Sequence, residues 1–225
     1  GTIQPIAEIA GLARKRGILM HTDAAQSVGK IPTRADELGI DLLSLAGHKI
    51  YAPKGIGALY IRKGIAAEVF CHGAGQEDGR RAGTENVLEI VGLGKACAIA
   101  GAALDQHCAH MRAMRDRLEA GLGRALAGIR VNGHREKRLP NTCSVSFLGL
   151  EANRLLEAIG QEVAASAGAA CHAGQVEVSH VLTAMRVPEE WAKGTVRFTT
   201  GRYTTAAEID RALAVIVAAV KRLRG

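Results

Sequence analysis

A lysine and a histidine stand together directly after an apolar run in the first quarter of the chain. Residues 41–46 read DLLSLA, and Gly47, His48 and Lys49 follow. Short apolar runs bounded by glycine are typical of buried strands, so we expect Lys49 at the end of a strand. A lone lysine at such a place ordinarily extends into the solvent. A lysine amine beside other reactive groups can instead add to a carbonyl compound as a nucleophile.

A second group of polar side chains follows another apolar run. Residues 17–21 read GILMH, and Asp23 and Gln26 come shortly after them. A pyridoxal phosphate site requires a lysine that binds the aldehyde and a carboxylate that keeps the pyridine nitrogen protonated. Lys49 suits the first role and Asp23 the second. Gln26 would donate to the ring oxygen, and His48 would face the phosphate or support the lysine.

Five motifs follow one another along nearly the whole chain: HTDAAQSVGK, AGHKIYAPKGIGALYIR, GQEDGRRAGTEN, SAGAACHAG and VRFTTGRYTTAAEID. In this order they resemble the NifS/IscS-type cysteine desulfurases, pyridoxal phosphate enzymes of aminotransferase class V. The resemblance implies the α/β architecture of pyridoxal phosphate-dependent transferases of fold type I. It also implies these roles: Schiff-base Lys49, Asp23 at the pyridine nitrogen, Gln26 at the ring oxygen, and His48 near the phosphate. One position departs from the family, since Ala46 replaces the serine of the IscS-like members and removes a hydroxyl from the phosphate site.

A glycine-rich, charged stretch occupies residues 72–86. Its composition suits an exposed surface loop. It also suits an anion-binding loop, because glycines free the backbone amides while Arg80, Arg81 and Thr84 add charge and a hydroxyl. The resemblance implies that Thr84 touches the cofactor phosphate in the site of a partner subunit. It therefore implies a homodimer with shared active sites.

Cys171 lies in the run of small residues at positions 166–174. Such a run packs poorly as core and predicts a mobile, accessible loop, in which a reactive thiol and an ordinary loop cysteine are equally supported. The resemblance implies that Cys171 is the persulfide-forming cysteine, on the longer loop of the IscS-like members. Cys97 and Cys143 are expected to be buried structural thiols, because they fall within helical and strand patterns.

Arg197 stands in a β-branched strand pattern that begins at Thr195. The planar fork of an arginine suits bidentate binding of a carboxylate. The resemblance implies that Arg197 holds the α-carboxylate of the substrate, L-cysteine.

The composition argues against several classes of function. The formal net charge is +7, but the basic residues are dispersed and aromatic residues make up only 3%, which argues against nucleic-acid binding. No apolar run of about 18 residues occurs, so no membrane span is predicted. The five cysteines include no CxxC pair, which disfavours a disulfide framework or zinc ribbon and favours a cytoplasmic location. His107, Cys108 and His110 lie close together without further ligands, so no metal site is predicted.

The succession of patterns predicts two domains. Residues 1–103 read as the later part of a pyridoxal phosphate-binding large domain with a mostly parallel sheet. Residues 104–225 read as a smaller α+β domain that carries the cysteine loop. The expected elements of the large-domain part are a helix at 5–16 and strands at 17–21, 41–46 and 57–62.

Helical periodicity extends from residue 87 to about residue 127, with a break near Gly101. It predicts two buried stripes: Leu88, Val91, Leu93, Ala96 and Ile99, then Leu104, Met111, Met114, Leu118 and Leu122. The small domain is expected to contain strands at 129–131 and 141–147, a helix at 151–159 and a terminal helix. Thr205 and Glu208 predict a capping box at the start of that last helix.

The function that these observations predict is a pyridoxal phosphate-dependent cysteine desulfurase. Lys49 would remove the α-proton of L-cysteine, and the Cys171 thiolate would attack the substrate sulfur. The products would be L-alanine and a Cys171 persulfide. The persulfide would pass to a sulfur acceptor, such as an iron–sulfur scaffold protein, for iron–sulfur cluster or thio-cofactor synthesis.

Two alternatives remain open. A selenocysteine lyase shares the cofactor chemistry and resembles the chain around Cys143 and Cys171. An inactive fragment that serves as a dimerisation or interaction module is the second. It is suggested because the chain opens at Gly1 without the segment that, in the family, carries a ring-stacking histidine and a phosphate-cradling turn. Either this is a fragment or another chain supplies that segment, so we do not expect the polypeptide alone to hold the cofactor tightly.

Overall fold

The chain divides into two compact units in a computed structural model that describes residues 1–172 and 175–225, without the side chains of residues 169–177. The amino-terminal unit is Gln4–Asp105, and the carboxy-terminal unit is Gln106–Gly225 together with Gly1–Ile3. The predicted division lies between residues 103 and 104 and assigns residues 1–3 to the first part. The backbone of Gly1–Ile3 instead bonds the carboxy-terminal unit, where Ile3 N donates to Lys137 O over 2.9 Å.

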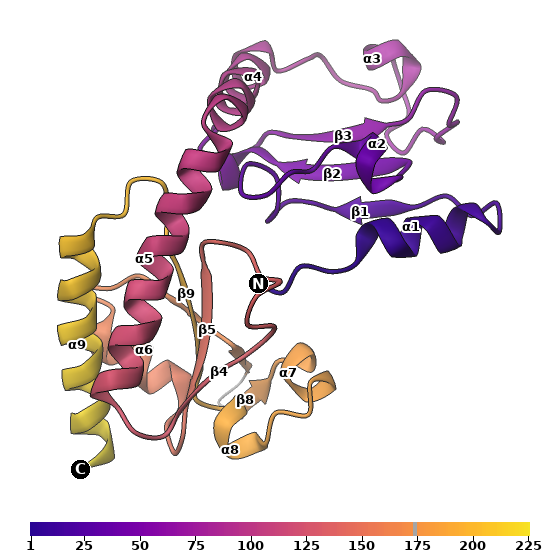
Figure 1. Cartoon of the computed structure of the whole chain (residues 1–225). Coiled ribbons are helices and arrows are strands. Elements are labelled where there is room, and N and C mark those ends of the chain that lie inside the picture. The colour runs from indigo at the N-terminus through magenta and orange to yellow at the C-terminus, as the bar shows by residue number, and fades with distance from the viewer. Residues whose placement is uncertain (173–174) are drawn as a thin grey trace. The chain divides into compact units, whose positions relative to one another are not determined.

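The amino-terminal unit contains a three-stranded sheet in the order β1-β2-β3 (Figure 1). Strands β1 (His21–Asp23) and β2 (Leu42–Ala46) pair in parallel, whereas β3 (Gly57–Ile61) pairs antiparallel with β2. The predicted strand at 17–21 is therefore displaced to His21–Asp23. The antiparallel pairing follows from the short connection between β2 and β3, because a parallel crossover requires a dozen or more residues.

Short helices precede or follow the strands of this sheet. Their bounds are Ile6–Arg14 for α1, Ala35–Leu38 for α2, Gln76–Gly79 for α3 and Gly47–Ile50 for the 3-10 helix η1. Helix α1 packs with Ala10 against the buried side chains of Ile40 and Leu43. This packing fixes the strand ends from which the candidate site extends.

Helix α4 (Val87–Ala102) exposes much of the stripe that its periodicity predicts to be buried. It packs through Leu93 and Ala96 against Ile50. Leu88 and Val91 are 83% and 65% exposed, so their predicted burial is wrong. The same holds for Ile99, which is 38% exposed. Apolar residues occur on every side of this helix, so its pattern does not define a single buried face. Within the unit, η1 covers only one of those sides.

Helix α5 (Leu104–Ala125) follows α4 after a break at Ala103, close to the predicted break. Among the described residues, no single helix is long and apolar enough to cross a membrane. Helices α4 and α5 meet that criterion only when they are taken together across the break.

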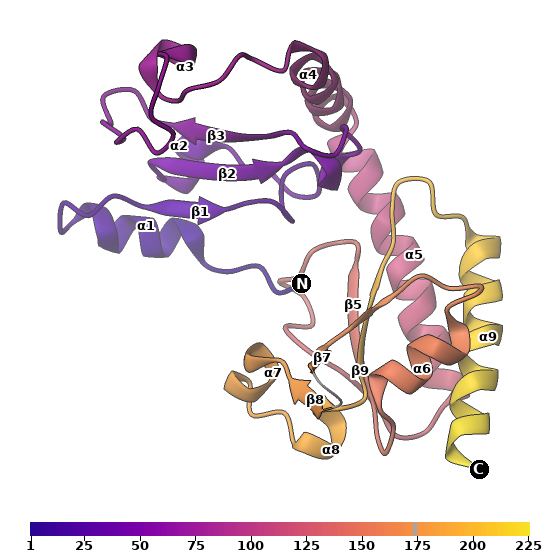
Figure 2. The ribbon, with the colours of Figure 1, turned by 180° about the vertical axis from the view of Figure 1, so that it is seen from behind.

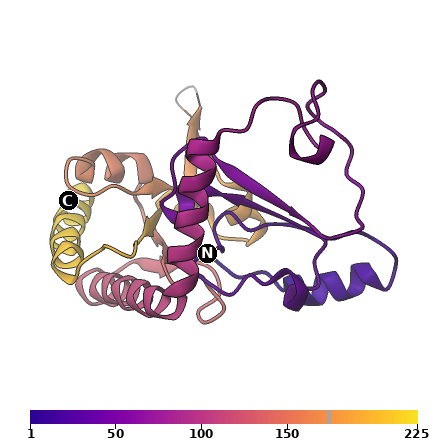
Figure 3. The same cartoon turned by 90° about the horizontal axis from the view of Figure 1, so that it is seen from above.

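The carboxy-terminal unit is built on an antiparallel sheet in the order β4-β5-β9-β6. These strands are Ile129–Val131, Thr142–Phe147, Thr195–Thr199 and Ser166–Ala167, and a separate hairpin joins β7 (Ala169–His172) to β8 (Gln175–Val178). The two central strands of the sheet, β5 and β9, are labelled in Figure 2. The remaining helices are α6 (Ala152–Ile159), α7 (His180–Ala184), α8 (Glu189–Ala192) and α9 (Ala206–Arg224). Helices α6, α9 and α5 follow one another around one side of the sheet (Figure 3).

The core of this unit lies between the sheet and those three helices. Phe147 of β5 is fully buried there with Leu122 of α5 and Ile216 of α9. The buried face predicted for α5 is confirmed at Met111, Leu118 and Leu122. The predicted capping box is also present, because the Thr205 hydroxyl accepts from Glu208 N and the Glu208 carboxylate accepts from Thr205 N over 2.7 Å.

Gly194 is a buried position where a side chain has no room. Its carbonyl accepts from Phe147 N over 3.0 Å, and a Cβ would collide with the carbonyl oxygen of Phe147. We expect Gly194→Ala to lower the free energy of unfolding by about 3 kcal/mol or more, because rigid backbone would have to move. Urea denaturation checks this. Gly123→Ala is the control, since that exposed helical site has open space and alanine should raise stability there by up to about 1 kcal/mol. Similar effects at both positions would contradict the prediction.

Candidate active site

Asp23 is the last residue of β1 and leads into a tight turn that carries Gln26. Asp23 Oδ1 accepts a hydrogen bond of 2.8 Å from Ala25 N. A carboxylate has about four acceptor sites, so Asp23 can accept from a further donor, most readily through Oδ2. Buried Ala24 anchors the turn, and its carbonyl accepts from Val28 N over 3.0 Å. The side chains of Asp23 and Gln26 are exposed.

His48 and Lys49 lie in η1, directly after β2. Gly47 begins this helix where only glycine fits, since a Cβ would lie 2.8 Å from the carbonyl oxygen of Ile56. Ile50 is buried and anchors its end. Tyr51 then adopts φ 68°, an unfavourable backbone conformation for a non-glycine residue. The exposed side chains of His48 and Lys49 therefore lie between two buried residues, Gly47 and Ile50.

The parallel pairing of β1 and β2 brings these two sets of residues to one edge of the sheet. Asp23 is the register partner of Ser44, and Lys49 follows the same strand end. Ligands of α/β sheets bind at the carboxyl ends of parallel strands. An amine, an imidazole, a carboxylate with one uncommitted oxygen and an amide are a donor set that fits pyridoxal phosphate.

Two contacts at this edge involve residues that sequence reasoning missed. His21 Nε2 lies 2.7 Å from Ser44 Oγ, on the sheet face that also carries Asp23. Lys30 is buried, and its Nζ donates to the backbone carbonyl of Lys49 over 3.2 Å. No sequence signal identifies Lys30, because a lysine in a turn is ordinarily expected in solvent.

Thr84 is exposed in the loop between α3 and α4. Arg81 holds that loop from within, since its Nη1 donates to Gly83 O and its Nε to Glu77 Oε1, both over 2.6 Å. The Arg81 charge is thus engaged inside the loop. Arg80 is also paired, since its Nη1 lies 3.5 Å from Asp78 Oδ2. Of the two open interpretations, surface loop or anion-binding loop, the second would therefore depend mainly on Thr84 and backbone amides.

Arg197 projects from β9 between buried Val196 and Phe198. It is exposed, and its Nη2 donates to Ser166 Oγ on the neighbouring strand β6 over 3.2 Å. The register partner on the other side is Ser144. A cation flanked by two hydroxyl-bearing residues on an exposed sheet face suits the binding of a small carboxylate.

Cys171 lies in strand β7, where the sequence predicts a loop. Its backbone pairs with Val176 of β8, and its side chain lies outside the described residues. Gly168 connects β6 to β7, and its N–H donates to Thr195 O over 2.7 Å. Only a few residues of chain separate Cys171 from Ser166, the side chain to which Arg197 donates. His172 shares this strand.

Cys143 and Cys97 differ in environment, although both are predicted to be buried. Cys143 is 1% exposed, as predicted, and its Sγ lies 3.7 Å from Glu119 Oε2. Burial, with a further contribution from Glu119, raises the pKa of Cys143 to about 12. The prediction for Cys97 is wrong, because it lies on the exposed side of α4.

The raised pKa of Cys143 predicts a loss of stability at high pH. Between pH 9 and about 12 the unfolded state releases the thiol proton while the folded state keeps it, so stability falls as pH rises. We expect the free energy of unfolding to fall by up to about 1.4 kcal/mol per pH unit more in the parent protein than in Cys143→Ala. Urea denaturation from pH 8 to 11 measures both slopes. Parallel curves would contradict this assignment.

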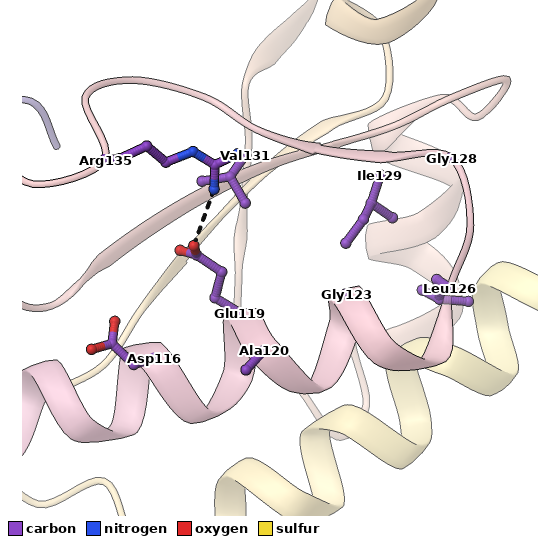
Figure 4. A pocket seen from close by; sticks show the side chains of 9 residues that line it. All are labelled: Asp116, Glu119, Ala120, Gly123, Leu126, Gly128, Ile129, Val131 and Arg135. Carbon is purple, nitrogen blue, oxygen red and sulfur yellow. Dashed lines mark hydrogen bonds and ion pairs between the residues drawn. The ribbon is translucent and has the colours of Figure 1, made fainter.

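A groove of about 550 Å³ lies between α5 and β4 in the carboxy-terminal unit (Figure 4). Glu119 lies in it and accepts from Arg138 over 2.6 Å and from Arg135 over 3.4 Å. Asp116 at its edge accepts from Arg115 over 2.7 Å. The lining, all within the described residues, includes none of the predicted site residues.

Among the described residues, no group of three or more His, Cys, Asp or Glu side chains is placed to hold a metal ion.

Comparison with known proteins gives a family for this chain. The family model described as "Aminotransferase class-V" matches residues 1–212. A cysteine desulfurase of Gluconacetobacter diazotrophicus is 47% identical over the whole chain, and the cysteine desulfurase IscS of Dictyoglomus turgidum is 44% identical. The chain spans 56% and 57% of these two proteins.

The crystal structure of a NifS-like protein from Rickettsia africae is similar in fold. Its TM-score is 0.90 at 29% identity, and the match covers 98% of this chain and 59% of that one. This likeness confirms the predicted α/β architecture of fold type I.

Proposed function

The chain belongs to the aminotransferase class V family, and we propose that it serves as the site-bearing part of a pyridoxal phosphate-dependent cysteine desulfurase. The observation that carries this proposal is the parallel pairing of β1 with β2, which puts Asp23 and Lys49 at one edge of the sheet. The similarity to named cysteine desulfurases over the full chain supports it. The reaction would convert L-cysteine to L-alanine and leave its sulfur on Cys171.

Four residues of the amino-terminal unit would hold the cofactor. The Lys49 amine would bind it covalently, Asp23 would accept from the protonated pyridine nitrogen, Gln26 would donate to the ring oxygen and His48 would contact the phosphate. When bound, pyridoxal phosphate supplies an electron sink for bonds at the substrate α-carbon. Thr84 would reach the phosphate in a second copy of the chain, which makes a homodimer part of the proposal.

The substrate would be held through its carboxylate by Arg197. The neutral amine of Lys49 would then take the α-proton as a general base. The Cys171 thiolate attacks the sulfur of L-cysteine, and a new S–S bond forms as the Cβ–S bond breaks. The electron pair of that bond goes to the Cβ carbon, which takes up a proton. L-cysteine and one thiol thus become L-alanine and one persulfide without an outside oxidant.

The persulfide sulfur would pass to an acceptor protein, for which an iron–sulfur scaffold is the candidate. The accessible thiol that the sequence predicts for Cys171 would permit transfer to a thiolate of such a partner. Transfer requires the acceptor to be a nucleophile toward the outer sulfur.

The test combines a spectrum with product analysis. Purified protein is titrated with pyridoxal phosphate, and the absorbance of bound cofactor is followed. L-cysteine or L-selenocysteine is then added, and L-alanine is quantified. Bound cofactor with alanine formed from L-cysteine supports the proposal. Preference for L-selenocysteine would assign a selenocysteine lyase instead. Because tight binding by this polypeptide alone is not expected, the titration extends to a large excess of cofactor. A folded protein that gives no saturable cofactor signal even at that excess would overturn the enzymatic assignment and favour an interaction module.

A further inference from the structure

Lys30 is the buried lysine that contacts the backbone of Lys49. Only 7% of its surface is exposed, whereas lysines are rarely buried without a partner. Its Nζ donates over 3.2 Å to the carbonyl oxygen of Lys49. Burial of an amino group is unfavourable unless its hydrogen bonds compensate. The contact therefore connects a costly buried donor to the segment that carries the candidate catalytic amine.

The turn that carries Lys30 is the one that follows Asp23. Backbone hydrogen bonds close it, with Lys30 N donating to Ser27 O over 3.0 Å. The neighbouring residue Gly29 has φ 71° and lies so close to η1 that a Cβ would come within 2.9 Å of Ile50 Cγ2. The turn thus contacts η1 at two adjacent points, through Gly29 and through Lys30.

We propose that Lys30 is a positioning residue that ties the backbone of Lys49 to the turn carrying Asp23 and Gln26. The inference rests on the function proposed above for Lys49 and Asp23. Pyridoxal phosphate is a rigid ring, so its aldehyde carbon and pyridine nitrogen must meet an amine and a carboxylate at a constant separation. Reacting groups need supporting contacts to keep such geometry. A hydrogen bond from the turn after β1 to the helix after β2 supplies that constraint.

Three variants separate this role from a general loss of stability. Lys30→Met removes the donor at similar length, and Lys30→Arg restores a donor. Lys63→Met is the matched control, because Lys63 is exposed in the same unit. Two readouts are needed. Hydrogen exchange of the cofactor-free protein reports the segment 47–52, and titration with pyridoxal phosphate reports affinity and the induced circular dichroism of the bound cofactor.

The proposal predicts a local effect of Lys30→Met. Amides of residues 47–52 should exchange about tenfold faster or more, while those of β5 in the other unit keep their rates. The dissociation constant of pyridoxal phosphate should rise by about tenfold, and its induced circular dichroism should change, since that signal depends on orientation. Lys30→Arg should recover part of the exchange protection and part of the cofactor affinity. Lys63→Met should match the parent protein in both measurements.

Unchanged exchange in 47–52 together with unchanged cofactor dichroism in Lys30→Met would overturn the inference. If the parent protein binds no cofactor even at a large excess, the proposed function fails, and the exchange measurement alone decides whether Lys30 holds the Lys49 segment. If Lys30→Met loses protection throughout residues 4–105, the same measurements are made on Lys30→Gln. Glutamine is polar, but its amide is one bond too short to reach the carbonyl of Lys49. Parent-like values in that variant would also count against the assignment of a positioning role to the lysine.

Discussion

The Lys49→Ala protein is expected to lose the absorbance of bound pyridoxal phosphate and to form L-alanine from L-cysteine at least about 10²–10⁴-fold more slowly. Lys49 is asked to do two things, to bind the cofactor covalently and to move the α-proton. Alanine removes both, and no neighbouring residue of η1 supplies an amine. Absorbance titration and alanine analysis measure the two losses separately.

Lys54→Ala is the control for this experiment. Lys54 is exposed in the loop that follows η1, so its removal deletes a nearby charge without deleting the proposed nucleophile. We expect parent-like cofactor binding and turnover. If Lys49→Ala kept the cofactor band and the rate, the interpretation of β1, β2 and η1 as a pyridoxal phosphate site would be wrong.

The Cys171→Ala protein is expected to bind cofactor normally and yet form alanine about 10³-fold more slowly or worse, because the nucleophile that takes the sulfur is missing. Proton abstraction precedes sulfur transfer and depends on Lys49. Exchange of the α-proton of L-alanine in deuterated water should therefore continue at the parent rate. Nuclear magnetic resonance follows that exchange, and mass spectrometry of the parent protein should detect one added sulfur on Cys171.

Cys97→Ala provides the matched thiol deletion, since Cys97 is an exposed cysteine on α4. It should leave alanine formation unchanged. Full turnover in Cys171→Ala would remove the persulfide step from the proposal, and loss of α-proton exchange in that variant would instead indicate damage to the cofactor site.

The hydrogen bond between the two strand-end segments makes the Lys30 and Lys49 variants distinguishable by experiment. Asp23 and Gln26 belong to the turn after β1, and Lys49 belongs to η1 after β2. Lys30 joins these segments. A Lys30 variant should therefore alter cofactor orientation while Lys49 is still present, whereas Lys49→Ala removes covalent binding altogether. The two variants give different spectra if both proposals hold.

The sequence by itself determined most of the elements and the side chains available for chemistry. The strand at β2, the helix α9 with its Thr205 cap and the buried stripe of α5 follow from patterns among neighbouring residues, which are local. Lys49, Asp23 and Gln26 were identified because glycine-bounded apolar runs place polar residues at strand ends. The motif order then predicted the family and the fold type, which the comparisons confirm.

Only the tertiary structure decided how distant segments meet. The antiparallel pairing of β3, the displacement of β1 to His21–Asp23 and the exposure of Leu88 on α4 depend on packing that no local period records. The burial of Lys30 is the clearest case. Its residue type predicts solvent, and its position under η1 exists because Gly29 lets the turn approach Ile50 closely enough for the amine to reach the carbonyl of Lys49.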